Sequence, residues 1–271
     1  MLDVAQKRAA FRELHKEGCF IIPNPWDAGS ARLLQSMGFK AVASTSAGLA
    51  WSLGRPDNGV SLKDVLTHLT ALCAAVDLPV NADFENAFAR EPEGVAANVL
   101  LAAATGVAGL SVEDSTGDPA NPLFETGLAI ERVRAARQAL DGAGLDVVLV
   151  ARTEGLLHGG NLDDATDRLV AFAEAGADCV FAPGLRNPAD IEVLVKAVAP
   201  LPVNIVVNGP GLTLDELAEL GVRRISVGGS LARAAYGAFL AAAGQIADSG
   251  AFAHLADGVA GRRLNEMFAE G

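Results

Sequence analysis

The sequence is poor in positive charge. Lysine and arginine together number 21, whereas aspartate and glutamate number 33, so the 271-residue chain carries a formal net charge of −12 at pH 7. Nucleic acids and anionic membrane surfaces repel such a chain, and we expect neither as a partner. A small anionic ligand would need a local cluster of positive side chains.

Long apolar runs and cysteines are scarce too. No run approaches the ~20 apolar residues of a membrane span, and the first residues lack the apolar core of a secretory signal. The three cysteines, Cys19, Cys73 and Cys179, are too far apart for a metal-binding knuckle and lie within apolar runs. We therefore expect a cytoplasmic protein whose thiols are reduced and buried.

Apolar runs and helical patterns alternate along the chain. A helical pattern follows each run, and Ser61, Asn161 and Thr213 each precede an acidic residue by three positions, as helix-capping residues do. The eight runs predict strands near residues 19–25, 41–47, 79–83, 107–113, 147–152, 179–183, 203–208 and 224–228. Eight strand-helix units favour a closed barrel over an open doubly wound sheet.

The predicted fold is therefore α/β, a (β/α)8 TIM-type barrel of about 250 residues. We treat residues 1–271 as a single domain. Residues 248–271 show near-helical apolar spacing and predict an extra C-terminal helix. This helix has no barrel strand to cover, so it would pack on the outside or against a neighbouring subunit.

Carboxylates stand where two of the expected strands end. The active site of such a barrel lies at the carboxyl ends of its strands, and Asp83 ends the third strand while Glu113 ends the fourth. Two neighbouring carboxylates, completed by water and a bidentate substrate, suit Mg2+, with Mn2+ as a substitute. The alternative is that each carboxylate caps a helix or pairs with a lysine.

Arg152 ends the fifth expected strand after four apolar residues. Its planar guanidinium can bind a substrate carboxylate through two parallel hydrogen bonds, and we predict this contact. A salt bridge to Glu154 or Glu113 is the alternative.

Other strand ends carry small polar residues and aromatic groups. Ser44-Thr45-Ser46-Ala47 offers hydroxyl and backbone N–H groups to an anion, although such residues are also ordinary in loops. Gly228-Gly229-Ser230 is either a phosphate site or a place of close packing, and we favour packing. We expect Trp26 and Asn208 to border the substrate. For His158, in a glycine-rich loop, acid–base chemistry and a solvated side chain both stay open.

Six segments together resemble the isocitrate lyase/phosphoenolpyruvate mutase superfamily, and nearly the whole chain shares its order of motifs. The segments are Pro23-Asn24-Pro25-Trp26-Asp27-Ala28, Ser44-Thr45-Ser46-Ala47, Gly54-Arg55-Pro56-Asp57, Asn81-Ala82-Asp83, Val112-Glu113-Asp114 and Ala151-Arg152-Thr153. The resemblance implies a (β/α)8 barrel that often exchanges its eighth helix between subunits and forms a homodimer or homotetramer. It also implies Mg2+ and a small anionic 2-oxo acid or dicarboxylate.

Matched position by position, the resemblance implies that Asp83 and Glu113 hold the metal. It places Asp57 near the metal's waters and Arg152 on the substrate carboxylate, while the loop from Ser44 to Ala47 receives the substrate. The catalytic candidates are Arg152, Asp57 and Ser46, and the substrate-binding candidates are Trp26, Ser44, Thr45, Ser46, Ala47, Arg152 and Asn208.

The chain also departs from the superfamily. Asn81 replaces the first acid of an Asp-x-Asp pair, which removes one negative charge near the metal. Residues 115–122 contain no cysteine, histidine or lysine. The isocitrate and methylisocitrate lyases carry a Lys-Lys-Cys-Gly-His-type loop there, and the mutase carries a Pro-Lys-Thr-Asn run. These differences argue against isocitrate cleavage and against phosphonate chemistry.

The retained groups suit the formation of an enolate. We predict a Mg2+-dependent carbon–carbon lyase that acts on a 2-oxo or 2-hydroxy dicarboxylate through an enolate intermediate, like oxaloacetate decarboxylase or a malate-type lyase. Decarboxylation needs least, because CO2 leaves without a proton. The alternatives are an enzyme like a phosphonomutase or phosphonopyruvate hydrolase, and a non-catalytic protein that binds a 2-oxo acid such as 2-oxoglutarate.

Overall fold

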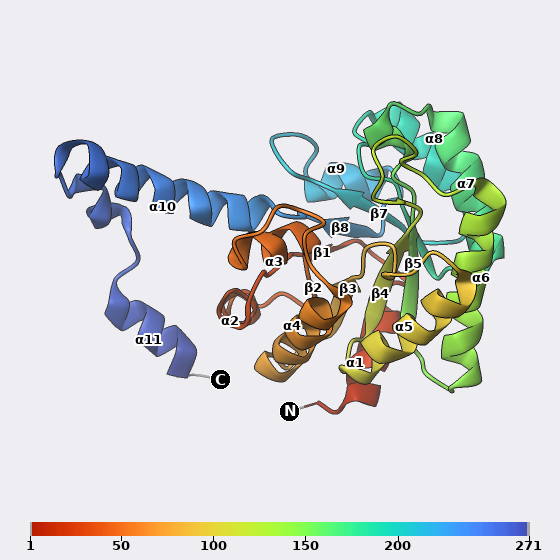
Figure 1. The fold of residues 1–271 in the computed structure, drawn as a ribbon, viewed down its shortest axis with the longest axis horizontal. Helices are drawn as coiled ribbons and strands as arrows, with labels where there is room; N and C mark the ends of the chain where they lie inside the picture. The colour runs from red at the N-terminus through yellow and green to blue at the C-terminus, as the bar shows by residue number, and fades with distance from the viewer. Residues whose placement is uncertain (1, 270–271) are drawn as a thin grey trace.

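Eight parallel strands form one sheet that curves around a central axis (Figure 1). The computed structural model describes residues 2–269. The strands are β1 (Phe20–Ile22), β2 (Val42–Ala43), β3 (Val80–Asp83), β4 (Gly109–Glu113), β5 (Val148–Arg152), β6 (Cys179–Phe181), β7 (Val203–Val206) and β8 (Arg224–Ser226). From β2 to β8 each strand pairs with its neighbour in sequence, and β1 pairs with β8.

Two hydrogen bonds close the remaining gap between β1 and β2. The backbone N–H of Ala43 donates to the carbonyl of Pro23 at 3.0 Å, just beyond the end of β1. The side-chain amide of Asn24 donates to the carbonyl of Ser44 at 2.9 Å. The strands therefore form a nearly closed ring, and the predicted (β/α)8 TIM-type barrel is confirmed.

Helices follow the strands, as the alternating pattern predicts. Their bounds are α1 (Val4–Leu14), α2 (Ala28–Ser36), α3 (Ser46–Ser52), α4 (Leu62–Ala75), α5 (Pro92–Ala104), α6 (Thr126–Gly142), α7 (Leu162–Glu174), α8 (Pro188–Val198), α9 (Leu214–Glu219), α10 (Ser230–Ser249) and α11 (Gly261–Ala269), with 3-10 helices η1 (Gly155–His158) and η2 (Ala253–Asp257). The expected caps are confirmed: Ser61, Asn161 and Thr213 each accept a hydrogen bond from the backbone N–H three residues later.

Apolar side chains fill two layers. Val148 and Val150 of β5 belong to the smaller layer inside the barrel, while Leu149 and Ala151 belong to the larger layer between strands and helices. This split follows from the alternation of side chains along a strand. Phe11 of α1 is fully buried in the inner layer. The interior is therefore packed at the end that α1 covers, which leaves the carboxyl ends of the strands for a site.

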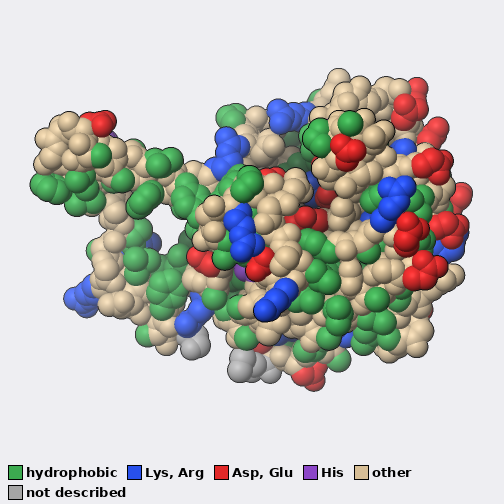
Figure 2. Space-filling view, in the orientation of Figure 1, with side chains coloured by type: hydrophobic (Ala, Val, Ile, Leu, Met, Phe, Trp, Pro, Cys, Tyr) green, Lys and Arg blue, Asp and Glu red, His purple; other side chains and the backbone are tan. Residues whose placement is uncertain are grey.

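The chain ends in an arm that leaves the barrel. In Figure 1, α10 projects outward, and η2 and α11 turn back toward α2. Arg32 of α2 donates to the carbonyl of Phe268 at 2.5 Å. Apolar side chains gather along the arm (Figure 2), and Phe239 and Leu240 are each 65% exposed. The predicted extra C-terminal helix is confirmed as α11. No helix within residues 2–269 is both long and apolar enough to cross a membrane.

Candidate active site

Arg152 gathers three carboxylates at the carboxyl end of β5. Its Nε forms an ion pair with Glu154 and lies 3.3 Å from Oε2 of Glu113, and its Nη1 lies 3.4 Å from Oδ1 of Asp83. The contact with Glu113 follows from the sheet register, which places the two residues opposite each other on β4 and β5. The ion pairs expected as the alternative are therefore confirmed. Contact of Arg152 with substrate stays a prediction.

The loop after β2 holds Asp83 in place. Oδ2 of Asp83 accepts hydrogen bonds from the backbone N–H and the hydroxyl of Ser46, at 2.9 and 2.8 Å. The hydroxyl of Ser44 accepts the backbone N–H of Asp83 at 2.8 Å, and that of Thr45 accepts the N–H of Gly48 at 3.2 Å. The hydroxyls of Ser44, Thr45 and Ser46 thus all form hydrogen bonds with other groups of the protein. Contact of residues 44–47 with an anion stays a prediction.

Negative charge is crowded around Arg152. Burial, together with the charges of Asp83 and Asp57, raises the pKa of Glu85 to about 8. Burial likewise raises the pKa of Glu113, although the positive charge of Arg152 lowers it in part. For Arg152 itself, burial lowers the pKa, but the nearby carboxylates outweigh this and hold it above its ordinary value. One guanidinium therefore faces more acidic groups than it can neutralise.

These acidic groups fit a divalent cation that is bound mainly by substrate and water. Within the described residues, no group of three or more histidine, cysteine, aspartate or glutamate side chains is arranged to hold a metal. Mg2+ commonly uses only one or two carboxylates, and Asp83 and Glu113 supply that number. Oε1 of Glu85 is buried without a hydrogen-bond partner, so the site also contains an unsatisfied acidic oxygen.

Two cavities meet at Arg152. One, of about 280 Å3, extends from the mouth of the barrel into its interior and is lined by Asp83 and residues 44–47. The other, of about 250 Å3, lies under residues 115–122 and is lined by Glu113 and His158. Ser46, Asp57, Leu157 and Arg152 line both cavities. The predicted catalytic candidates thus lie together, at the border between the two spaces.

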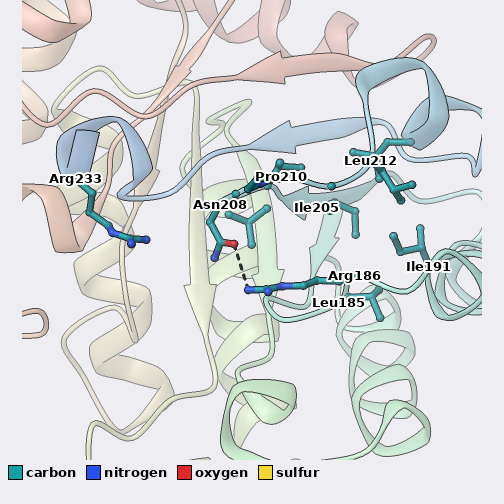
Figure 3. Close-up of a pocket in the computed structure, with 13 residues that line it drawn as sticks. Leu185, Arg186, Ile191, Ile205, Asn208, Pro210, Leu212 and Arg233 are labelled. Atoms are coloured by element: carbon teal, nitrogen blue, oxygen red, sulfur yellow. Dashed lines mark hydrogen bonds between the residues drawn. The ribbon is translucent and has the colours of Figure 1, made fainter. Parts of the chain in front are cut away.

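The other predicted residues lie farther out. Asn208 accepts a hydrogen bond from Arg186 at 3.2 Å. It lines both the 280 Å3 cavity and a neighbouring cavity of about 370 Å3, which is drawn in Figure 3. Trp26 packs beside Gly48 and does not line the 280 Å3 cavity. A Cβ on Gly229 would lie 2.9 Å from the ring of Trp51, which supports packing as the role of that glycine.

Sequence reasoning missed the structural role of Asp114. Its carboxylate accepts hydrogen bonds from the hydroxyl of Thr153 at 2.7 Å and the backbone N–H of Glu154 at 2.9 Å, and it pairs with Arg168 at 3.3 Å. It therefore fixes the segment after β5 beside Arg152. In the sequence Asp114 is marked only by its position directly after Glu113. That position does not reveal that the two adjacent carboxylates have different partners.

Known proteins are similar to this chain over most of its length. The family model for phosphoenolpyruvate phosphomutase matches residues 11–247. The 2-methylisocitrate lyase of Escherichia coli (strain K12) is 34% identical over 225 residues, covering 79% of this chain and 75% of that protein. The oxaloacetate decarboxylase of Rhodopseudomonas palustris (strain BisB5) is 29% identical over 271 residues, covering 96% of this chain and 89% of that protein.

Solved structures share the fold. A protein from Burkholderia cenocepacia J2315, provisionally described as a lyase/mutase, has a TM-score of 0.94 and 48% identity, with 98% of this chain and 96% of that chain covered. Phosphonopyruvate hydrolase in complex with oxalate and Mg2+ has a TM-score of 0.87 and 26% identity, with 97% and 95% covered. The chain therefore belongs to the phosphoenolpyruvate phosphomutase family, within the isocitrate lyase/phosphoenolpyruvate mutase superfamily of lyases and mutases.

Proposed function

We propose that the protein is a Mg2+-dependent carbon–carbon lyase of a 2-oxo or 2-hydroxy dicarboxylate, with oxaloacetate decarboxylation as the first candidate reaction. The convergence of Asp83, Glu113 and Arg152 where the 280 Å3 and 250 Å3 cavities meet carries this proposal. Two relatives named for carbon–carbon cleavage, the 2-methylisocitrate lyase and the oxaloacetate decarboxylase, support the reaction type. The phosphonopyruvate hydrolase complex with oxalate and Mg2+ supports the metal and the kind of ligand.

Each group of the site has an assigned task. Asp83 and Glu113 would hold Mg2+, which when bound supplies positive charge that polarises a 2-oxo group. Ser46 keeps Asp83 oriented through its two hydrogen bonds. Arg152 would bind the carboxylate next to the 2-oxo group, exchanging part of its ion pairing with Glu113 and Glu154 for the substrate.

Decarboxylation then needs one proton donor. The bond between C3 and the C4 carboxylate breaks, CO2 leaves, and the bonding electron pair passes into the enolate of pyruvate. A proton then adds to C3. Asp57 is our candidate donor, because it lines both cavities, and partial desolvation and the nearby charge of Asp83 raise the pKa of its carboxyl.

Retro-aldol cleavage of a substituted malate is the second candidate reaction. It requires a base that removes the proton of a substrate hydroxyl. His158 lines the 250 Å3 cavity together with Glu113 and Arg152, which favours it as that base.

Oxalate binding tests the proposed site. Oxalate is flat, dianionic and chelating like the enolate of pyruvate, so it should bind more tightly than pyruvate and only with Mg2+. Calorimetric titration with and without Mg2+ measures this binding. A pyruvate-release assay on a panel of 2-oxo and 2-hydroxy acids should show that the protein with Mg2+ converts oxaloacetate faster than Mg2+ alone does. Isocitrate and phosphonopyruvate should be poor substrates, because residues 115–122 lack cysteine, histidine and lysine.

Each other outcome of that experiment has a definite meaning. Oxalate binding with no turnover of any panel member would identify a 2-oxo acid binding protein instead of a lyase. Turnover of phosphonopyruvate would identify a phosphonate-cleaving enzyme. If millimolar oxalate fails to bind in the presence of Mg2+, enolate chemistry at this site is contradicted.

We also infer that the arm joins subunits. Phe239 and Leu240 of α10 and Phe252 beyond it are each more than 60% exposed, and burying apolar surface of this size favours association. Light scattering should therefore give the mass of a homodimer or homotetramer. The eighth barrel helix is α10, which follows β8. A monomer at micromolar concentration would contradict its exchange between subunits.

A further inference from the structure

Arg224 is a buried charge in the interior of the barrel. The residue is 3% exposed, and its Nη1 donates to Oδ1 of Asn81 across the barrel at 3.2 Å. Its guanidinium carbon lies 5.8 Å from the centre of the Phe11 ring. Within residues 2–269, no carboxylate forms an ion pair with Arg224, and its buried Nε has no acceptor. A buried charge without a partner is unfavourable, so an anion bound there would relieve it.

Asn204 lies beside Arg224 with a second unsatisfied atom. The two residues are opposite each other in the pairing of β7 with β8. Nδ2 of Asn204 donates to the hydroxyl of Ser226 at 3.0 Å, whereas its buried Oδ1 accepts no hydrogen bond within residues 2–269. Turning the amide over exchanges its oxygen and nitrogen, and the Ser226 hydroxyl can serve as donor or acceptor. Asn204 can therefore present a donor on the same side as Arg224.

Arg224 and Asn204 line the same 280 Å3 cavity as Asp83 and Arg152. The two arginines, Arg224 and the half-buried Arg152, differ in their partners. Arg152 is within ion-pairing distance of three carboxylates, whereas the hydrogen-bond partner of Arg224 among the described residues is the neutral amide of Asn81. Arg186 also lines the cavity, but it is exposed and bonds to Asn208. The unneutralised positive charge of the cavity therefore lies deep inside the barrel.

We propose that Arg224 and Asn204 form an anion subsite that binds a second carboxylate of the substrate. This rests on the proposed function, in which the first carboxylate lies near Arg152. Asn81 and Asp83, which contact Arg224 and Arg152, are two residues apart on β3, a rise of about 6.6 Å. Carbon–carbon bonds are about 1.5 Å long, so a dicarboxylate of about four carbons can reach both arginines. The subsite thus selects four-carbon dicarboxylates over monocarboxylates.

The preference for L-malate over L-lactate measures the subsite. Both are 2-hydroxy acids, but only malate has a second carboxylate. The wild-type protein with Mg2+ should prefer malate, and Arg224→Met should weaken malate binding by about 10- to 100-fold, the loss of a charge-assisted contact. Lactate and oxalate, which do not reach the subsite, should bind the variant as they bind the wild type. Calorimetric titration gives all three affinities.

Two further variants keep this test decisive. Arg223→Met removes the adjacent arginine, whose Nη1 donates to the Gly18 carbonyl at 2.6 Å, and it should leave the malate preference unchanged. Asn204→Asp places a carboxylate beside Arg224 and should abolish the preference while the buried arginine itself is kept, which covers the case in which Arg224→Met does not fold. Unchanged preference in a folded Arg224→Met or Asn204→Asp variant would show that Arg224 only supports the barrel.

Failure of the proposed function would be distinguishable. It would appear as a lack of oxalate binding to the wild-type protein with Mg2+. In that case titration with malate in the absence of metal tests the subsite independently of the proposed function. Weaker malate binding to Arg224→Met than to the wild type supports the subsite, and equal malate affinities of the two proteins overturn it.

Discussion

Asp83→Asn should lower kcat/KM by about 10³-fold while the barrel stays folded. The amide oxygen can still accept the hydrogen bonds that Ser46 donates at 2.9 and 2.8 Å, so the loop after β2 keeps its support. The amide carries no negative charge, however, and the cation loses one of its two proposed ligands. Turnover measured across a range of Mg2+ concentrations should show a much higher Mg2+ requirement, and circular dichroism should show an unchanged fold.

Asp163→Asn is the matched control for this change. Asp163 is an exposed acid in the first turn of α7, and its replacement should leave the Mg2+ requirement unaltered. An Asp83→Asn variant that binds oxalate with the wild-type Mg2+ requirement would remove Asp83 from the metal site. Asp83 would then serve only as a partner of Ser46 and Arg152.

The barrel could be predicted because its information is local. The Val148–Arg152 strand, for example, is a short run of mainly apolar, buried residues, and the helix that follows has its own capping residue, Asn161. Closure between β1 and β2 was less accessible, because it depends on the hydrogen bond from Ala43 of β2 to Pro23, which lies just beyond the end of β1. The direction of the arm was not predictable either, since few contacts with the barrel determine it.

The site was predictable where strand ends determine it. Asp83, Glu113 and Arg152 end consecutive strands, so the fold alone brings them together. Arg224 starts the eighth expected strand, 224–228, but the sequence does not reveal that its side chain points into the barrel, because that depends on the register between β7 and β8. The sequence made Ser46 a catalytic and substrate-binding candidate but did not reveal its contact with Asp83, because that contact depends on how the loop after β2 folds over β3.

Arg152→Lys should separate substrate binding from structural ion pairing. Lysine keeps the charge but loses the planar fork, so affinity for oxalate with Mg2+ should fall by about 1.5–3 kcal/mol, the value of charge-assisted hydrogen bonds. Because Arg152 pairs with Glu113 and Glu154 as well, the melting temperature should also fall. A purely structural arginine would change the melting temperature and leave the oxalate affinity of the folded variant unaltered.

Arg168→Lys provides the comparison that makes the Arg152 result interpretable. Its guanidinium pairs with Asp114 at 3.3 Å and donates to the Phe124 carbonyl at 3.1 Å, and it does not line the 280 Å3 cavity. Arg168→Lys should therefore lower stability without weakening oxalate binding. If both variants lose stability and only Arg152→Lys loses affinity, the guanidinium at the end of β5 contacts the ligand. Equal oxalate affinities in the two variants would assign Arg152 to the ion pairs alone.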